Sequence, residues 1–355
     1  MQAPRILLIA NAGPEVGGGH VMRSLTLAKA LTARGAICSF ASSPAVDAIL
    51  DVFGPDLARE PATSLDPEAL VDALTGVAFD AIVFDHYGLA RNEHASLSRG
   101  RATLVIDDLA DRPLGADLVL DSGPERQPME YALLVESETR LLLGPDYAPV
   151  RPEFAALRDQ VLARRSEGGP VGRILVALGL TDAGELTGRV IDRLRPRLGL
   201  IRLDVVVGST APSLSALSKI AHRDDRLSLH VDTPDMATLM AEADIGIGAA
   251  GSTVWERCVL GLPSANIVVA ENQRPASAAL AARRAALVVD AGAPDFEAQI
   301  DRAMVRLMTD ADLRAQLTHA AAQVCDGRGA DRVAQAFMEV ISRRGARSQE
   351  LPLQV

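Results

Sequence analysis

The sequence contains few cysteines and few aromatic residues. Only Cys38, Cys258 and Cys325 occur in 355 residues, and aromatic residues make up 3% of the chain. No Cys-x-x-Cys or His-x-x-x-His pair is present, and the acidic pair Asp107-Asp108 has no further ligands at metal-binding spacing. We therefore expect no disulfide framework, no metal site and no cofactor. A reducing cytoplasm is the compartment that this cysteine usage predicts.

Long apolar runs and clusters of positive charge are also absent. No segment approaches the roughly 20 apolar residues that span a bilayer, and the apolar stretch 6–10 is too short for a signal peptide. The net charge is −10, with no dense basic run, which argues against nucleic acid as a partner and against stable membrane association. An apolar content of 48% with 23% charged residues is typical of a globular protein.

Short β-rich runs alternate with helical stretches along the chain, which is typical of parallel α/β layers. We expect strands at residues 5–10, 37–41, 81–85, 103–107 and 117–121, and a second series at 174–177, 203–207, 227–231, 245–247, 266–269 and 287–290. The stretch 144–170 between the two series is rich in proline, glycine and charge. We therefore predict an α/β fold of two doubly wound, Rossmann-like domains that face each other across a cleft.

The domain boundaries follow from this alternation. The first domain is predicted over residues 1–149 and the second over 172–325, joined by a linker at 150–171 that carries one helix. A helix predicted near 311–325 closes the second domain. A C-terminal helix is predicted at 326–343, and residues 344–355 are predicted to form a mobile tail.

Three consecutive glycines, Gly17, Gly18 and Gly19, stand between the first predicted strand and a helix that begins near His20. Apolar residues recur at helical spacing after the histidine. A strand, a glycine loop and a helix N-terminus suit an anion, although the spacing is not that of the Gly-x-Gly-x-x-Gly dinucleotide motif. On this segment alone, an anion-binding loop and a flexible turn with an incidental histidine both stay open.

A second glycine-rich junction follows the strand predicted at 245–247. The small residues Gly251, Ser252 and Thr253 let a ligand contact the backbone, and either hydroxyl can cap the next helix or donate to a phosphate. Glu256 follows in the first turn, where its carboxylate can accept from both hydroxyls of a ribose. The alternative is an acid that only stabilises the helix dipole. We favour binding because the glycine-rich junction immediately precedes Glu256.

Polar residues also follow other predicted strands. Asn272 and Gln273 carry amides that can bind a sugar or a phosphate. His86 and Tyr87 follow the strand at 81–85, where a doubly wound sheet exposes ligand residues. The pair Asp107-Asp108 either orients a base, binds a sugar hydroxyl or forms a turn. The remaining histidines, assigned structural roles, are His94, His222, His230 and His319.

Taken in order, these motifs resemble a known enzyme family. GGGHVMRSLTLAKAL, FDHYGL, VIDDLADRPLGADLVLD, LLGPDYAPVRPEF and GAAGSTVWERCVLGLPSANIVVAENQ appear in the order seen in the UDP-2,4-diacetamido-2,4,6-trideoxy-β-L-altropyranose hydrolases of pseudaminic acid biosynthesis. Their fold resembles that of the GT-B glycosyltransferases. The resemblance runs from about residue 6 to residue 273. It is interrupted in two loops, where this chain has Leu180 with Gly184-Glu185, and Ser122-Gly123.

The resemblance implies that His20 is the general base for a water that attacks the anomeric carbon with inversion. Glu256 then binds the ribose, the glycine loop lies against the diphosphate and sugar, and no metal takes part. UDP leaves without a strong general acid, and the free sugar feeds nonulosonic acid synthesis for surface or flagellar glycans. The residues expected to contact this UDP-sugar substrate are Gly18, Gly19, Arg23, His86, Tyr87, Gly251, Ser252, Thr253, Glu256, Asn272 and Gln273.

Two other functions use the same motifs. A GT-B glycosyltransferase would pass the sugar from the UDP-sugar donor to an acceptor, although the sequence shows no apolar or basic patch for a membrane-bound acceptor. A non-catalytic protein that binds nucleotide sugars would have no need for a base such as His20 beside the anomeric carbon.

Overall fold

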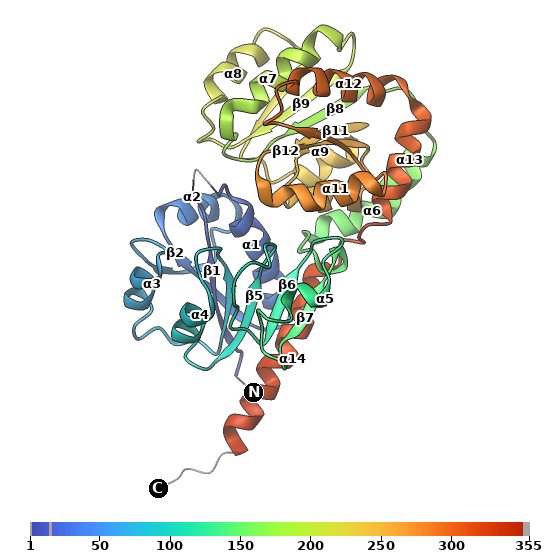
Figure 1. The fold of residues 1–355 in the computed structure, drawn as a ribbon. Helices are drawn as coiled ribbons and strands as arrows, with labels where there is room; N and C mark the ends of the chain where they lie inside the picture. The colour runs from blue at the N-terminus through green and yellow to red at the C-terminus, as the bar shows by residue number, and fades with distance from the viewer. Residues whose placement is uncertain (1, 14–15, 351–355) are drawn as a thin grey trace. The chain divides into compact units, whose positions relative to one another are not determined.

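The computed structural model describes residues 2–13 and 16–350, and the chain divides into two compact units (Figure 1). The first unit comprises the chain up to Pro149 together with the segment from Arg328 onward. The second unit comprises Val150–Gly327. Each unit is built on its own parallel sheet.

The first unit has a seven-stranded sheet of order β3-β2-β1-β4-β5-β6-β7, in which every pairing is parallel. The central strands are buried on both faces, as expected for a parallel sheet covered by helices. The strands are β1 Arg5–Ala10, β2 Ile37–Ser42, β3 Ala58–Pro61, β4 Ala81–Asp85, β5 Ala102–Ile106, β6 Leu118–Asp121 and β7 Arg140–Leu143. The helices are α1 Gly19–Thr32, α2 Pro44–Phe53, α3 Pro67–Ala73, α4 Arg91–Ser98, α5 Pro128–Tyr131, η1 Pro145–Tyr147 and α14 Gly329–Glu350.

The second unit has a six-stranded sheet of order β10-β9-β8-β11-β12-β13, also parallel throughout. Its strands are β8 Arg173–Ala177, β9 Arg202–Val207, β10 Leu227–Val231, β11 Ile245–Ala249, β12 Ser264–Val268 and β13 Leu287–Asp290. Its helices are α6 Pro152–Ser166, η2 Ala183–Glu185, α7 Leu186–Leu194, η3 Arg195–Arg197, α8 Leu214–Ala221, α9 Met236–Glu242, α10 Thr253–Val259, η4 Glu271–Gln273, α11 Arg274–Ala282, α12 Phe296–Thr309 and α13 Ala311–Ala322.

Both sheets reverse their strand order at one point. In the first unit the chain builds outward from β1 to β3 and then returns to place β4 on the other side of β1. In the second unit the same reversal lies between β8 and β11. The carboxyl ends of the strands beside such a reversal are where open α/β sheets bind ligands. The topology therefore predicts ligand sites at the carboxyl ends of β1 and β4 in the first unit, and of β8 and β11 in the second.

Every strand predicted from the sequence is present, and the structure adds β3 and β7. Both additional strands have four residues and lie at the two edges of the first sheet. The sequence of β3, AREP, has only partial burial, and β7 exposes its arginine. β3 has no continuous apolar run, and the three leucines of β7 form a shorter run than the roughly four to eight residues by which a buried strand is recognised.

In place of the linker expected at 150–171, the structure has α6 as part of the second unit. The arginines of α6 donate to backbone carbonyls. Arg158 donates to the carbonyl oxygens of Val259 and Ala322 at 2.5 Å each, and Arg165 donates to that of Leu260 at 2.9 Å. Carbonyls at helix C-termini lack partners within their own helix. The arginines that made this stretch resemble an exposed linker therefore bind the C-terminal ends of α10 and α13.

The C-terminal segment rejoins the first unit, and its helix is longer than the one expected at 326–343. Helix α14 packs beside α1 and buries Phe337 in the core of this unit (Figure 1). Residues 344–350, expected in a mobile tail, continue α14, and Arg344 pairs with Asp117 at 2.6 Å. Residues 351–355 lie outside the described residues. None of the described helices is both long enough and apolar enough to cross a bilayer.

Candidate active site

His20 lies at the carboxyl edge of the first sheet, at the start of α1. A backbone bridge between Gly13 and Gly17 closes the preceding loop, with the Gly17 nitrogen 2.8 Å from the Gly13 oxygen. Gly17 has φ +71°, a conformation that favours glycine. Gly18 is the N-cap of α1 and Gly19 its first residue. The glycines therefore turn the chain tightly from β1 into the helix that presents His20.

The side chain of Asp85, the last residue of β4, is fully buried beside His20. Its Oδ1 lies 2.6 Å from His20 Nδ1 and 2.6 Å from Arg23 Nη2, and its Oδ2 accepts from Arg23 Nε at 2.7 Å and from Ser24 Oγ at 3.2 Å. Burial alone would raise the pKa of Asp85, but Arg23 and His20 outweigh it and lower this pKa well below its usual range. The carboxyl group is therefore ionised.

The ionised Asp85 determines the tautomer of His20. A carboxylate only accepts hydrogen bonds, so His20 Nδ1 must carry the proton that it donates. The lone pair of the neutral imidazole is then on Nε2. Arg23 Nη2 lies 3.1 Å from Nδ1, but both nitrogens are donors directed at Asp85. Asp85 thus orients the His20 ring and leaves Nε2 as the ring nitrogen that can accept a proton.

Tyr87 and Asp108 contact His20 and Arg23, respectively. The Tyr87 ring packs against the His20 ring in an edge-on arrangement, with centroids 4.6 Å apart. The Tyr87 hydroxyl donates to Asp108 Oδ1 at 2.5 Å, and Arg23 Nη1 donates to Asp108 Oδ2 at 3.0 Å. Burial and the Asp108 charge raise the pKa of Tyr87 above its usual value, so the hydroxyl stays protonated. Arg23 therefore links two carboxylates, one at the end of β4 and one after β5.

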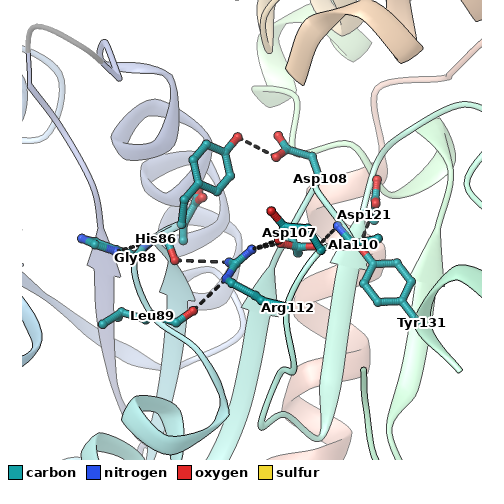
Figure 2. Close-up of polar contacts among 12 residues, drawn as sticks. His86, Gly88, Leu89, Asp107, Asp108, Ala110, Arg112, Asp121 and Tyr131 are labelled. Carbon is teal, nitrogen blue, oxygen red and sulfur yellow. Dashed lines mark hydrogen bonds and ion pairs between the residues drawn. The ribbon is translucent and has the colours of Figure 1, made fainter. Parts of the chain in front are cut away.

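The loop after β4 is held in place by Arg112, a residue that the sequence interpretation did not single out. Figure 2 shows Arg112 between Leu89 and Asp107. Its guanidinium donates to Leu89 O at 2.9 Å, to His86 O at 3.4 Å and to Asp107 Oδ1 at 2.8 Å. His86 Nδ1 accepts from the Gly88 nitrogen at 3.0 Å, and burial lowers the pKa of His86. His86 is thus a neutral ring with one nitrogen bound inside its own loop.

A second buried network supports Asp107 and Asp108 (Figure 2). The Tyr131 hydroxyl lies 2.8 Å from Asp107 Oδ2 and 2.8 Å from Asp121 Oδ2. Arg126 pairs with Asp121 at 2.5 Å and donates to the carbonyl oxygen of Asp108 at 2.9 Å. The sequence interpretation missed Tyr131 and Arg126, because neither lies at a strand end. It also did not assign a role to Asp85, although this residue ends an apolar strand and directly precedes His86.

The second unit presents its own polar group at the carboxyl ends of β11 and β12. Gly251, Ser252 and Thr253 form the turn from β11 into α10, with the Val254 nitrogen 3.0 Å from the Gly251 oxygen. A Cβ on Gly251 would lie 3.8 Å from Gln273 Nε2. Asn272 and Gln273 lie in η4, and Gln273 Oε1 accepts from the Val269 nitrogen at 3.0 Å. The structure therefore brings the glycine turn and Gln273 together.

Glu256, on α10, is 9% exposed and incompletely partnered. Its Oε1 accepts from Arg151 at 3.0 and 3.1 Å, whereas Oε2 is buried without a hydrogen-bond partner. Burial raises the pKa of Glu256 against the opposing effect of Arg151. An unsatisfied buried oxygen of this kind is costly to the folded protein.

In the part of the chain that the structure describes, no group of three or more His, Cys, Asp or Glu side chains is arranged to hold a metal ion.

No model of a known protein family matches the chain. It is 25% identical over 349 residues to the spore coat polysaccharide biosynthesis protein SpsG of Bacillus subtilis, covering 92% of this chain and 95% of SpsG. It is also 25% identical over 282 residues to the UDP-2,4-diacetamido-2,4,6-trideoxy-beta-L-altropyranose hydrolase of Campylobacter jejuni, covering 78% of this chain and 96% of that enzyme.

Among solved structures, MurG of Acinetobacter baumannii superimposes with a TM-score of 0.65 at 18% identity, over 95% of this chain and 99% of MurG. The fold is that of the GT-B glycosyltransferases. This confirms the predicted fold class, two Rossmann-like parallel α/β domains. The similarity to the C. jejuni enzyme is consistent with the family resemblance of the sequence motifs.

The pairing of Asp85 with Arg23 and His20 makes a prediction about stability. Asp85→Asn should lower the free energy of unfolding by about 3 kcal/mol or more at pH 7, because Arg23 loses its buried counter-ion. Since the folded-state pKa of Asp85 is lowered, its contribution is complete above the usual carboxyl pKa and is lost as pH falls toward the folded value. The difference from wild type should therefore shrink below about pH 4.

Denaturant unfolding followed by circular dichroism at several pH values measures this difference. Asp111→Asn is the control, because the Asp111 side chain is 58% exposed and its pairing contributes little. A difference between wild type and Asp85→Asn that stays constant down to pH 3 would contradict the ionised, paired state of Asp85.

Proposed function

We propose that this protein is an enzyme acting on nucleotide sugars, and that it hydrolyses a UDP-linked 2,4-diacetamido-2,4,6-trideoxy sugar. The anomeric C–O bond is cleaved with inversion, releasing UDP and the free sugar. The observation that carries this proposal is His20, held by Asp85 with its Nε2 lone pair available, at the strand-order reversal of the first sheet. The similarity to the C. jejuni hydrolase supports the choice of substrate.

In the proposed reaction, His20 Nε2 removes a proton from water while the water oxygen forms a bond to C1 of the sugar. The bond between C1 and the phosphate oxygen breaks, and its electron pair leaves with UDP. Asp85 stabilises the imidazolium that forms. Because the water attacks from the face opposite to the leaving group, the configuration at C1 inverts. UDP is a weak base, so this step needs no strong general acid.

The neighbours of His20 take supporting roles in this proposal. Gly18 and Gly19 let the substrate approach the backbone at the start of α1, where anions are favoured. Arg23 is occupied by its two carboxylates and keeps Asp85 ionised. Tyr87 and His86, on the loop that Arg112 holds, form the wall of the sugar site beside the His20 ring.

In the second unit, we assign the UDP moiety to the turn before α10. Glu256 binds the ribose hydroxyls, which supply hydrogen bonds to its unsatisfied Oε2. Gly251, Ser252 and Thr253 receive the phosphates through backbone N–H groups and hydroxyls. Asn272 and Gln273 add amide contacts close to Gly251.

The cell compartment and the metabolic role belong to the same proposal. All three cysteines, at 38, 258 and 325, are buried free thiols, as is usual for proteins of a reducing cytoplasm. We assign the free sugar to nonulosonic acid synthesis for surface or flagellar glycans, which is the role that the family resemblance implies.

Transfer to an acceptor is the second candidate, because the GT-B fold and the His20–Asp85 pair serve it equally well. An acceptor hydroxyl would then lose its proton to His20 in place of water. The two functions differ only in the nucleophile, so an experiment that follows the nucleophile separates them.

Incubation of the protein with the UDP-sugar in oxygen-18 water tests the proposal directly. We expect one labelled oxygen in the free sugar and none in UDP, since water attacks carbon. Label in UDP would show attack on phosphorus and contradict the mechanism. Turnover that requires an added acceptor, with no labelled sugar, would identify a transferase instead.

His20→Asn should reduce turnover by about 10²–10⁴-fold, the usual contribution of a general base, while UDP affinity stays near wild type. The reason is that UDP is assigned to the second unit, whereas His20 lies in the first. Steady-state kinetics and calorimetry measure the two quantities. His319→Asn, at an exposed position of α13, is the matched control. A variant that retains substantial hydrolysis would remove His20 from the role of base.

Glu256→Gln should weaken UDP binding by about 1.5–3 kcal/mol, the range for a hydrogen bond to a charged group, which is about 10- to 150-fold in affinity. Turnover at saturating substrate should change little, because the ribose is remote from the reacting carbon. Calorimetry with UDP measures the affinity, and Glu242→Gln on the exposed surface of the same unit is the control. Unchanged affinity would exclude Glu256 from the ribose site.

A further inference from the structure

Arg257, the residue after Glu256 on α10, is a buried cation behind the turn of Gly251–Thr253. Its side chain belongs to a residue that is 3% exposed. Nη2 donates to the carbonyl oxygen of Ala249 at 2.8 Å and to Asn266 Oδ1 at 2.9 Å, and Nη1 donates to Thr253 Oγ1 at 3.2 Å. A Cβ on Gly248 would lie 2.2 Å from Nη1, so β11 accommodates this guanidinium only because position 248 has no side chain.

The partners of Arg257 are all neutral. They are a carbonyl, an amide and a hydroxyl, and no ion pair found among residues 2–13 and 16–350 includes Arg257. The neighbouring Glu256 carboxylate pairs with Arg151 instead. Nε of Arg257 is buried without any acceptor, and burial lowers the pKa of the guanidinium to about 10. The Glu256 charge only partly offsets the effect of burial, and the hydrogen-bond partners of Arg257 include no counter-ion, so burying this charge is costly in the unliganded protein.

We infer that Arg257 is a positioning residue for the diphosphate of the nucleotide, whose negative charge supplies a counter-ion to a guanidinium that is hydrogen-bonded only to neutral partners. This inference rests on the proposed function, which assigns the phosphates to the turn of Gly251–Thr253. Arg257 acts from behind this turn, without contacting the ligand. The ends of β11 and α10 that it binds are the two ends of the turn.

Two hydrogen bonds of Arg257 connect its positive charge to the turn of Gly251–Thr253, to which the phosphates are assigned. Arg257 fills an acceptor site of the Thr253 hydroxyl, which leaves the hydroxyl proton for another acceptor and strengthens it as a donor. It also binds the Ala249 carbonyl oxygen, the negative end of a dipole beside the turn. Both effects favour an anion on the turn, and both depend on the positive charge.

A purely structural role is the competing explanation, since Arg257 also ties β11 to β12. Arg165 of α6 provides the matched comparison within the same unit. It donates to the carbonyls of Met240, Ala243 and Leu260, and burial lowers its pKa to about 9. Arg165 is a half-buried arginine that, like Arg257, donates to neutral partners, but its partners lie before β11 and after α10, away from the turn. If Arg257 is only structural, the two arginines should behave alike.

The experiment compares Arg257→Met and Arg165→Met with wild type, using calorimetry with UDP, UMP and uridine and the fluorescence of the single tryptophan, Trp255, as a report on folding. We expect Arg257→Met to lose UDP affinity on the order of tenfold or more, UMP affinity by less, and uridine affinity not at all. Arg165→Met should bind all three ligands as wild type does, whatever its thermal stability.

Equal UDP affinity of Arg257→Met and wild type, or an equal loss for uridine, would overturn the inference. Should Arg257→Met fail to fold, Arg257→Lys and Arg257→Gln give the same comparison, because lysine keeps the charge and glutamine keeps only hydrogen-bond donors. The inference requires tighter UDP binding by the lysine variant, and equal binding would overturn it. Failure of wild type to bind UDP would instead overturn the proposed function.

Discussion

The buried carboxylate of Asp85 is the group on which the candidate active site depends. It ends β4 beside the end of β1, and three side chains of one helix, α1, converge on it. His20, Arg23 and Ser24 are three and four residues apart, so they lie on one side of the helix. The Arg23 guanidinium stabilises the Asp85 carboxylate, and this carboxylate determines the tautomer of the His20 imidazole. Arg23 also donates a hydrogen bond to Asp108. Without this charge, the His20 ring would lose the acceptor of its Nδ1 proton, and Arg23 would keep Asp108 as its carboxylate partner.

The two units share one topology, but the buried charges at their candidate sites have different partners. In the first, Asp85, Asp107 and Asp121 each have an arginine partner, and the pKa of Asp85 is lowered. In the second, Glu256 has one unsatisfied oxygen and a raised pKa, and the hydrogen-bond partners of Arg257 are neutral. In the proposed function, the first arrangement is organised before a ligand arrives, which suits proton transfer. In the same proposal, a nucleoside diphosphate would complete the second arrangement.

The sheets themselves follow from local sequence. Apolar runs such as Ile6–Ala10 and Ile245–Ala249, bounded by glycine and polar residues, specify buried parallel strands, and all of them formed. The edge strands of the first sheet were harder to predict from the sequence, since β3 and β7 are short and partly polar. The assignment of α6 and α14 to their units was not visible in the sequence. It depends on hydrogen bonds from Arg158 to helix ends more than 100 residues away and on packing of Phe337 into a distant core.

The sequence by itself determined the fold class and brought His20, Tyr87, Glu256 and Gln273 to strand ends where ligands bind, because strand alternation and glycine turns are local properties of the chain. Only the tertiary structure decided which atoms of these side chains carry a proton or can accept a hydrogen bond. The proton on His20 Nδ1 depends on Asp85, 65 residues away, and Arg112 and Tyr131 hold loops that they do not neighbour in sequence. The unsatisfied Oε2 of Glu256 and the unsatisfied Nε of Arg257 exist only because packing removes water from both. Burial and partners are properties of the folded chain, and no local pattern encodes them.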